Sequence, residues 1–442
     1  MSAMAGLSFV YVALPVSMAV YLFLPPYWRP GGLLALSLAY YFAVFPRLAL
    51  YMVGLAALDL AALEVMRRWD KNTLIRKYCL AFSAVKNLGC IALFSALLRD
   101  GQLAPEALLG LYVVTLSGLG CVLEMYRRQI PGHCSRLHFA LYCFYFPRLA
   151  AGPLLPYREF APQLESPNPG FGEIMQGLGL FVQGAVKFAV LGEHLLLVYT
   201  DMRLIPPGEA SVLGVWATVA TLALNVYFRF SGCADMARGI GRMMGIDLPE
   251  NFRRPFLARS VTDFLGRFNS TFTRYVRQAL GGRFSEGIAS VVGLLIIGGA
   301  SGLWFGFSVG RFAWGIFLGV FLVLERYAYP SLLDKLPAPV GRLCTLIIIL
   351  FGFALFDAAT LQQGFQNAIR MLGLDGSPLW SDRLGYLLES NRLLLTASLL
   401  FATGGAGAMS ELLRGWLPPL AYNALCAAVV AALLALLTTF AI

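Results

Sequence analysis

Apolar runs of about 20 residues recur along the whole of this 442-residue chain. A helix of that length spans the hydrocarbon core of a lipid bilayer. The composition agrees, because 58% of the residues are hydrophobic, only 13% are charged and the mean hydropathy is +0.70. The sequence therefore predicts an all-α, polytopic membrane protein and excludes a soluble globular enzyme.

The apolar runs predict a shell of about 11–13 transmembrane or re-entrant helices. The first run has no basic leader and no clear cleavage site, so we expect it to be retained as a span. We predict one domain, residues 1–442, with sections at 1–136, 137–164, 174–329 and 330–442. The approximate spans are 7–24, 32–45, 48–66, 79–98, 105–124, 174–200, 210–228, 287–309, 312–329, 343–358, 385–402 and 418–440.

The charge distribution predicts the topology. The formal net charge of +10 reports the positive-inside rule and contact with anionic lipid, so we expect membrane lipids as partners and no nucleic acid. Five basic residues against one acidic residue place the loop 67–77 in the cytoplasm. Alternation then puts 229–283 and 330–342 inside, and 201–208, 359–384 and both termini outside.

Residues 138–163 do not have the pattern of a simple span. Three prolines and a glycine occur within ten residues, which breaks any helix. Irregular backbone at membrane depth is tolerated only where it is buried in protein or lines a cavity. We therefore expect a re-entrant segment followed by an interfacial turn, with an ordinary cytoplasmic loop as the alternative.

Residues 257–283 have a different pattern. Apolar residues recur at spacings of three and four and form one face, which predicts a basic helix lying in the membrane interface. The arginines of the other face would meet anionic lipid or acidic cofactor groups, and a plain surface anchor is the alternative. These arginines are Arg259, Arg267, Arg274 and Arg277.

Four motifs carry a resemblance. Residues 146–153 read FPRLAAGP and are followed by YREF at 157–160; residues 228–236 read FRFSGCADM and lead to PENF at 249–252. Residues 259–264 read RSVTDF, and residues 301–306 read SGLWFG. Together they are similar to the membrane-bound O-acyltransferase (MBOAT) motifs FPQLVAGPI with YRDF, FDFSGYSDMAIG with PENF, SRSITEFW and SGLWHG. The bacterial branch, with alginate O-acetyltransferases and teichoic-acid D-alanyl transfer proteins, is the most similar.

The resemblance implies a helical shell around a central tunnel that joins the two membrane faces. The acyl donor, acyl-coenzyme A or an acyl-carrier protein, would wait on the cytoplasmic side and the acceptor outside; no covalently bound cofactor is expected. Scattered cysteines without a Cys-x-x-Cys pair give no sign of a metal site. The residues implied in the tunnel are Asn225, Tyr227, Ser231, Asp235, Asn269, Ser301, Trp304 and Phe305.

The departures concern the catalytic positions. The family's essential histidine in SGLWHG corresponds to Phe305, and phenylalanine accepts no proton. A second bacterial histidine, in RRWH, corresponds to Asn269, which resembles family branches that use asparagine there. His194 is the main candidate for a relocated base, while His133 and His138 lie on the approach to the re-entrant turn. For Asp235, a buried ion pair with an arginine explains the presence of a carboxylate at least as well as a catalytic role does.

Two functions follow from the resemblance. The first is a catalytically impaired, pseudoenzyme subunit of a complex that modifies or exports a polysaccharide of the cell envelope. The alternative is an active O-acyltransferase that moves an acyl or acetyl group to an envelope polysaccharide with a relocated or partner-supplied base. In both, we expect a multi-pass protein of the bacterial inner membrane that works with other envelope or polysaccharide-biosynthesis proteins.

Overall fold

The computed structural model describes the backbone of residues 6, 8–44, 46–99, 105–130, 134–148, 152–165, 167–206, 208–284, 286–329 and 336–440. Within these residues every regular element is a helix, and one isolated antiparallel bridge joins Phe252 to Phe268. Among them, seven helices are long and apolar enough to cross a membrane, and three more apolar helices are shorter. The predicted all-α, polytopic membrane protein is confirmed.

The chain forms two compact units. Unit 1 comprises Met1–Ala185 and Cys233–Glu250, and unit 2 comprises Val186–Gly232 and Asn251–Phe440. Helix α10, Val212–Met243, supplies residues to both units. The single domain expected from the sequence, with its four sections, stays a prediction.

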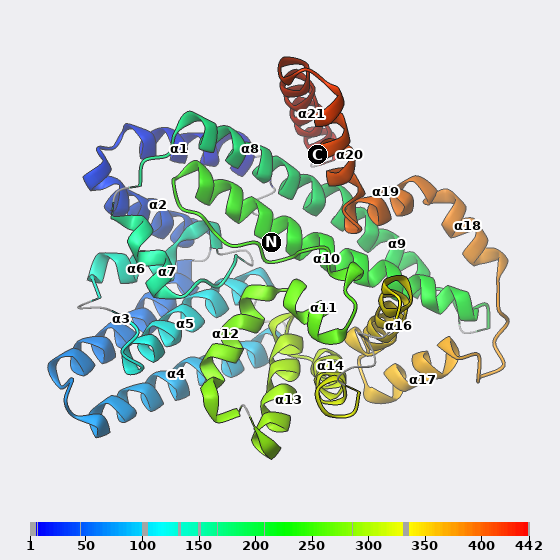
Figure 1. The fold of residues 1–442 in the computed structure, drawn as a ribbon, viewed down its shortest axis with the longest axis horizontal. Helices are drawn as coiled ribbons and strands as arrows, with labels where there is room; N and C mark the ends of the chain where they lie inside the picture. The colour runs from blue at the N-terminus through cyan, green and yellow to red at the C-terminus, as the bar shows by residue number, and fades with distance from the viewer. Residues whose placement is uncertain are drawn as a thin grey trace. The chain divides into compact units, whose positions relative to one another are not determined.

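Unit 1 holds the helices that follow the predicted N-terminal spans. Helices α3, α4 and α5 lie side by side (Figure 1). Both α3 and α5 begin at a proline, whose fixed φ and missing N–H suit a first helical turn. The bounds are η2 Phe9–Ala13, α1 Leu14–Phe23, η3 Pro26–Trp28, α2 Arg29–Val44, α3 Pro46–Arg68, α4 Thr73–Arg99, α5 Pro105–Tyr126, α6 Arg136–Phe144, η4 Phe146–Arg148, α7 Tyr157–Phe160, η5 Ala161–Leu164 and α8 Phe171–Val186.

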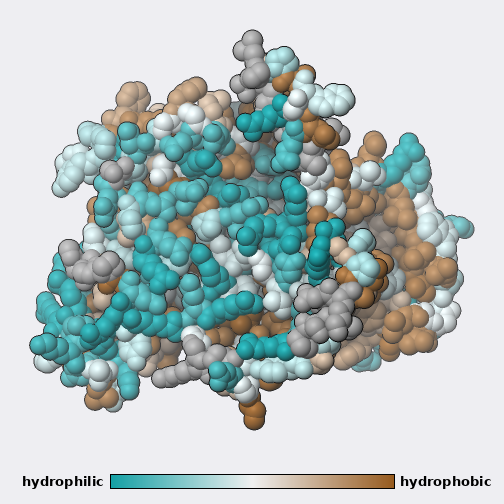
Figure 2. Space-filling view, viewed as in Figure 1, coloured by the Kyte–Doolittle hydropathy of each residue, from teal (hydrophilic) through white to brown (hydrophobic). Residues whose placement is uncertain are grey.

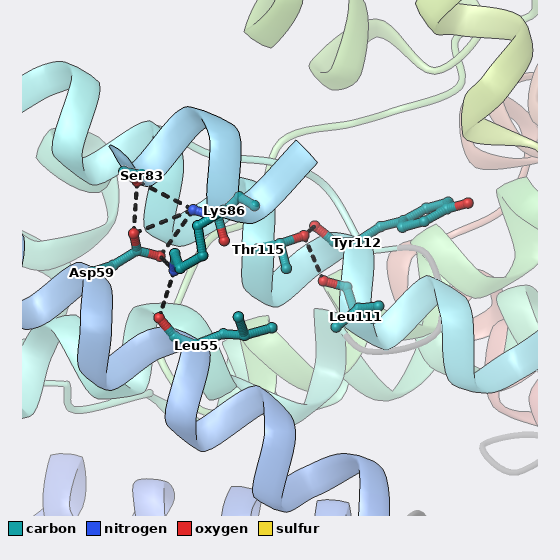
Figure 3. Close-up of polar contacts among 8 residues, drawn as sticks. Leu55, Asp59, Ser83, Lys86, Leu111, Tyr112 and Thr115 are labelled. Atoms are coloured by element: carbon teal, nitrogen blue, oxygen red, sulfur yellow. Dashed lines mark hydrogen bonds and ion pairs between the residues drawn. The ribbon is translucent and has the colours of Figure 1, made fainter. Parts of the chain in front are cut away.

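A buried polar cluster joins α3 to α4 (Figure 3). Asp59 is 1% exposed and accepts hydrogen bonds from Ser83 Oγ at 2.6 Å and Asn87 Nδ2 at 3.1 Å. Lys86 Nζ lies 2.8 Å from Asp59 Oδ2 and donates to the carbonyl of Leu55 at 2.7 Å. An ionisable residue inside a membrane helix needs such partners. The cluster therefore fixes the register of α3 against α4.

Helix α5 covers the same cluster from a third side. A Cβ added at Gly118 would overlap the Asp59 carboxylate, so only glycine lets α5 approach this closely. Thr115, also on α5, turns its hydroxyl back to the carbonyl of Leu111 at 2.7 Å (Figure 3). The three helices thus meet at one buried polar centre.

The predicted re-entrant stretch is irregular and buried. Residues 152–156 have no helical structure, and Phe146, Pro147 and Arg148 form one buried turn. Glu124 of α5 accepts from the backbone N–H groups of Tyr157 at 2.9 Å and Arg158 at 3.1 Å. Glu124 thus satisfies the first two N–H groups of α7, which have no partner within that helix. Residues 149–151 lie outside the described part of the chain.

Unit 2 holds the helices of the predicted core and C-terminal sections. Four of them begin at a serine or threonine whose hydroxyl accepts the N–H of the third helical residue, the expected N-cap signal. The bounds are η6 Lys187–Gly192, α9 Glu193–Arg203, η7 Pro255–Leu257, α11 Val261–Arg267, α12 Ser270–Leu280, η8 Gly281–Phe284, α13 Gly287–Trp304, α14 Val309–Tyr327, α16 Ala338–Phe356, α17 Leu361–Met371, α18 Asp382–Ser390, α19 Arg392–Ala402, α20 Gly405–Trp416 and α21 Pro419–Phe440.

Helices α13 and α14 lie side by side (Figure 1). Glycines of the two helices form the seam between them. A Cβ at Gly298 would lie 2.6 Å from the backbone nitrogen of Gly319 and would overlap the carbonyl of Gly315. A Cβ at Gly302 would overlap the carbonyl of Arg311. Each helix carries two glycines four residues apart, the spacing that lets membrane helices pack backbone to backbone.

Two predicted spans have different bounds in the structure. The span expected at 210–228 continues without interruption to Met243, so the aromatic-polar motif at 228–236 lies inside α10. The span expected at 385–402 is divided into α18 and α19 at Asn391, which is not helical. Hydropathy alone did not distinguish one long helix from two short ones.

The prediction of one continuous helix over 257–283 is wrong. The helix is interrupted at Asn269, which has a left-handed φ of 55°, a conformation that asparagine tolerates better than most residues. Asn251 Oδ1 accepts the backbone N–H of Thr271 at 3.0 Å and so starts α12 separately from α11. The predicted apolar face is buried in both pieces, and hydrophilic residues gather over them in Figure 2. The buried members are Val261, Phe264, Phe268, Phe272 and Val276.

Candidate functional site

The turn after α13 positions Phe305. Phe305 N donates to the carbonyl of Gly302 at 3.1 Å, and Gly306, with a φ of +126°, reverses the chain. Only glycine adopts that backbone conformation readily. Ser308 then caps α14 by accepting the N–H of Arg311. The Phe305 side chain is thus held by a fixed turn between two closely packed helices.

Phe305 lies in a cluster of five aromatic rings, which we name the aromatic cluster. Its ring centroid is 4.6 Å from that of Phe230 and 5.6 Å from that of Phe268. Trp314 and Phe356 lie at 5.9 Å and 5.8 Å. These are normal distances for edge-to-face aromatic packing, which adds about 0.5–1.5 kcal/mol per pair. The cluster draws rings from α10, α14, α16 and the α11–α12 junction, so it is a tertiary packing centre.

The aromatic cluster contains no group that accepts a proton. Phenylalanine has no polar atom, and the indole of Trp314 carries only a donor N–H. Trp314 is fully buried, and its Nε1 has no hydrogen-bond partner among the described residues. Leaving a buried donor without a partner costs free energy. A hydrogen bond from this N–H to an oxygen of a bound molecule would recover that free energy.

Asn269 stands directly after Phe268 of the aromatic cluster. Its Oδ1 accepts from Asn251 Nδ2 at 3.0 Å, whereas its own Nδ2 has no partner within the described chain. The residue is 3% exposed. The side chain is therefore oriented by Asn251 and presents a donor, not a base.

Ser301 and Trp304, two of the residues predicted to line the tunnel, are both buried in α13. Neither belongs to the aromatic cluster. The hydroxyl of Ser301 donates to the carbonyl of Ile297 in its own helix at 2.7 Å. Trp304 packs on Phe272 of α12, with 4.7 Å between ring centroids. The role of each residue in a tunnel stays a prediction.

Three more predicted site residues lie on the part of α10 that belongs to unit 2. Asn225 Nδ2 donates at 2.6 Å to the carbonyl of Gly192, which ends the π-helical turn η6. Tyr227 packs on Phe252 at 6.2 Å between centroids. Ser231 is buried, and its hydroxyl has no partner in the described residues. Asn225 therefore has a structural task, and Ser231 keeps a free hydroxyl.

Asp235 lies in unit 1. It pairs with Arg238 one turn later, with 3.4 Å between Oδ1 and Nη1. Arg238 also donates to the carbonyl of Leu248 at 3.3 Å. The interpretation of Asp235 as a partly buried ion pair is thus supported by its geometry.

The histidines give no base at Phe305 in the described structure. His194 Nδ1 lies 2.8 Å from the carbonyl of Val190, one turn earlier, and Glu193 beside it pairs with Arg229 at 3.4 Å. His138 belongs to α6 of unit 1, where burial lowers its pKa. His133 lies outside the described residues. The ring contacts that the structure gives Phe305 are with three phenylalanine rings and one indole, none of which accepts a proton.

The basic residues of 257–283 have different surroundings. Arg267 pairs with Asp263 at 2.6 Å within α11, and Arg259 and Arg274 lie outside the buried core. Arg277 stands at the edge of a cavity of about 570 Å³, and burial on that side lowers its pKa. Arg326 shares this edge, and apolar residues such as Leu294 line the interior.

A second, smaller cavity in unit 2 was not predicted. Its volume is about 150 Å³, and residues of α9, α10, α16 and α17 line it, including Tyr199, Asp357 and Asn367. None of the four family motifs includes a residue that lines it. Residues so far apart in the chain have no shared spacing that would identify them together.

Comparison with known proteins supports one family. The sequence model of the MBOAT, membrane-bound O-acyltransferase family, matches residues 122–334. Probable alginate O-acetylase AlgI of Pseudomonas aeruginosa is 26% identical over 58% of this chain and 49% of its own length. Peptidoglycan O-acetyltransferase of Helicobacter pylori is 29% identical over 55% of this chain and 48% of its own length. Teichoic acid D-alanyltransferase of Bacillus subtilis is 22% identical over 56% of this chain and 67% of its own length. The chain thus spans about half the length of the first two relatives.

These relatives are bacterial, and the chain has seven long apolar helices within its described residues. It is therefore an integral, multi-pass protein of the inner membrane, as the sequence predicts, and membrane lipids surround it.

Proposed function

Since residues 122–334 belong to the membrane-bound O-acyltransferase family, we propose that this chain is a catalytically silent member of it. Its role would be that of a subunit in an envelope complex that modifies or exports a polysaccharide. The names of the relatives, which refer to alginate, peptidoglycan and teichoic acid, support an envelope polymer as the target. The observation that carries the silent assignment is the aromatic cluster around Phe305.

Transfer of an acyl group to a hydroxyl needs a group that takes the hydroxyl proton as the oxygen attacks. Such a general base contributes roughly 10²–10⁴-fold to the rate. Phe305 corresponds to the family's histidine by the resemblance of the SGLWFG motif, and four further aromatic rings contact it. The Oδ1 of the nearby Asn269 already accepts from Asn251 Nδ2, and amides are not proton acceptors at neutral pH. The site therefore lacks its base.

The other components of the complex follow from this assignment. Catalysis falls to a partner protein, and acyl groups enter the complex from acyl-coenzyme A or an acyl-carrier protein on the cytoplasmic side. The chain itself contributes a membrane scaffold, lipid contact or a conduit.

The test is an acyl-transfer assay on the purified full chain in lipid nanodiscs. Labelled acetyl-coenzyme A is supplied with alginate or peptidoglycan oligosaccharides, and a family member with histidine at this position serves as the active control. We expect no transfer above background from the wild type. We also expect none from Phe305→His, because the other four rings of the aromatic cluster remain.

Transfer by the isolated wild type would overturn the proposal. Its loss in His194→Ala, with the folded protein recovered in equal yield, would then identify His194 as a relocated base. Phe305→Leu, which keeps an apolar side chain, controls for packing at this position.

A further inference from the structure

The smaller cavity of unit 2, which we name the polar cavity, has one wall of polar side chains and one of apolar side chains. Its volume is about 150 Å³. The polar wall includes Tyr199, Asp357 and Asn367, and the apolar wall includes Phe353 and Leu222. Typical pockets for drug-sized ligands measure roughly 300–1,000 Å³, so this one accepts a single small unit and not an extended chain.

Asp357 is the charged centre of the polar cavity. Tyr199 donates its hydroxyl to Asp357 Oδ2 at 2.6 Å, and Arg203 Nη1 lies 2.7 Å from the same oxygen. The other carboxylate oxygen, Oδ1, accepts no hydrogen bond from the described residues. A carboxylate oxygen is a strong hydrogen-bond acceptor. Oδ1 is therefore ready to accept a hydrogen bond from a neutral hydroxyl.

Helix α17 supplies two amides to the same wall. Gln363 and Asn367 are one turn apart, so they lie on the same face of the helix. Gln363 Oε1 accepts the backbone N–H of Ala359 at 3.1 Å, which leaves its Nε2 without a partner in the described chain. The Asn367 amide has no hydrogen-bond partner there either. Each amide thus offers donors, and Asn367 also offers an acceptor.

The position of the polar cavity connects it with the aromatic cluster. Phe356 belongs to the aromatic cluster, and Asp357 is the next residue in the chain. The flanking segments 201–208 and 359–384, the second of which contains α17, are the ones that the charge pattern places outside the membrane. A molecule arriving from the outer side would meet the polar cavity beside the position at which the family transfers its acyl group.

We infer that the polar cavity binds one sugar unit of a carbohydrate. A pyranose ring carries hydroxyl groups along its edge, each of which both donates and accepts, and C–H groups on its faces. The carboxylate oxygen of Asp357 and the amides of Gln363 and Asn367 match the edge, while Phe353 and Leu222 match a face. The inference rests on the proposed function, because it assigns that function's polysaccharide to this cavity.

The test is a binding measurement on the full chain in nanodiscs, by saturation-transfer NMR and calorimetry. The probes are tetrasaccharides of glucose, of N-acetylglucosamine and of a hexuronic acid. At least one should bind the wild type. The double variant Gln363→Ala/Asn367→Ala should bind it about tenfold more weakly or worse, because two hydrogen-bonding amides are lost.

Gln366→Ala is the matched control, since Gln366 lies on the exposed side of α17 and does not line the cavity. It should keep wild-type affinity, and both variants should be recovered folded, although the double variant also loses the hydrogen bond from Ala359 N to Gln363 Oε1. The inference is overturned if none of the three tetrasaccharides binds at millimolar concentration, or if the double variant binds like the wild type. Acyl transfer by the wild type would overturn the silent assignment instead and would leave this binding result unchanged.

Discussion

Replacing Lys86 with methionine tests the buried centre of unit 1. The methionine fills the space of the lysine stem but removes the cation 2.8 Å from Asp59. The aspartate is 1% exposed and the lysine side chain 9%, so water does not replace the lost partner. Ser83 and Asn87 still donate to the carboxylate, which leaves a hydrogen-bonded but unpaired charge inside a membrane helix.

The magnitude follows from that geometry. Two unit charges 4 Å apart interact with about 4 kcal/mol at the effective dielectric of roughly 20 that suits proteins. Removing one partner of a buried pair costs about 3–5 kcal/mol in measured cases. We therefore expect Lys86→Met to lose about 3–5 kcal/mol of unfolding free energy. The double variant Asp59→Asn/Lys86→Met should lie much closer to the wild type, because no unpaired charge remains.

The assay is reversible unfolding of the full chain in mixed micelles with increasing denaturing detergent, followed by circular dichroism. The four proteins of the double-mutant cycle are measured together, so the coupling energy of the pair is obtained directly. A loss below about 1 kcal/mol for Lys86→Met would refute the reasoning, since it would mean that the pair is hydrated or replaceable.

Three further substitutions address other parts of the fold by the same unfolding measurement. Arg148→Lys should cost about 2–3 kcal/mol, because an ammonium cannot reproduce the two hydrogen bonds of the buried guanidinium, to the carbonyl of Tyr142 at 3.1 Å and to Ser117 Oγ at 2.9 Å. Gly298→Ala should cost about 1–3 kcal/mol, because its methyl group would overlap the backbone of α14. Glu325→Ala should cost about 1–2 kcal/mol, because its carboxylate accepts the first two N–H groups of α11 at 2.5 Å and 2.8 Å.

Matched controls keep these predictions specific. Arg136→Lys changes an exposed arginine, Gly89→Ala adds a methyl group in open space, and Glu389→Ala removes an exposed carboxylate. Each control should stay within about 0.5 kcal/mol of the wild type. A buried-site variant that matches its control would contradict the corresponding contact.

The sequence predicted the helical membrane fold well because hydropathy over about 20 residues is a local signal. It also predicted the irregular backbone near Pro147 and Pro153, since proline removes a donor wherever it occurs. It did not predict the break at Asn269, because the partner that stabilises the break is Asn251, on the other side of α11. A helical apolar period passes through such a break unchanged.

The candidate site was predictable only in part. Family motifs identified Phe305 as the position to examine, but its neighbours come from Phe230, Phe268, Trp314 and Phe356, which only the folded chain brings together. The residues that line the polar cavity are likewise brought together only by the folded chain. Its amides stand on a helix that the sequence assigned to an outer loop, and no local pattern marks them as ligand-binding groups.

The glycine seam between α13 and α14 has a mechanical consequence. Where the backbones touch at Gly298, Gly302, Gly315 and Gly319 with no side chain between them, neither helix can slide or tilt without losing these contacts. The two helices should therefore move as one rigid body and exchange their amide hydrogens as one protected unit. Phe305 at the end of one and Trp314 in the other then keep a constant separation, and any gate near them must be formed by elements outside this pair.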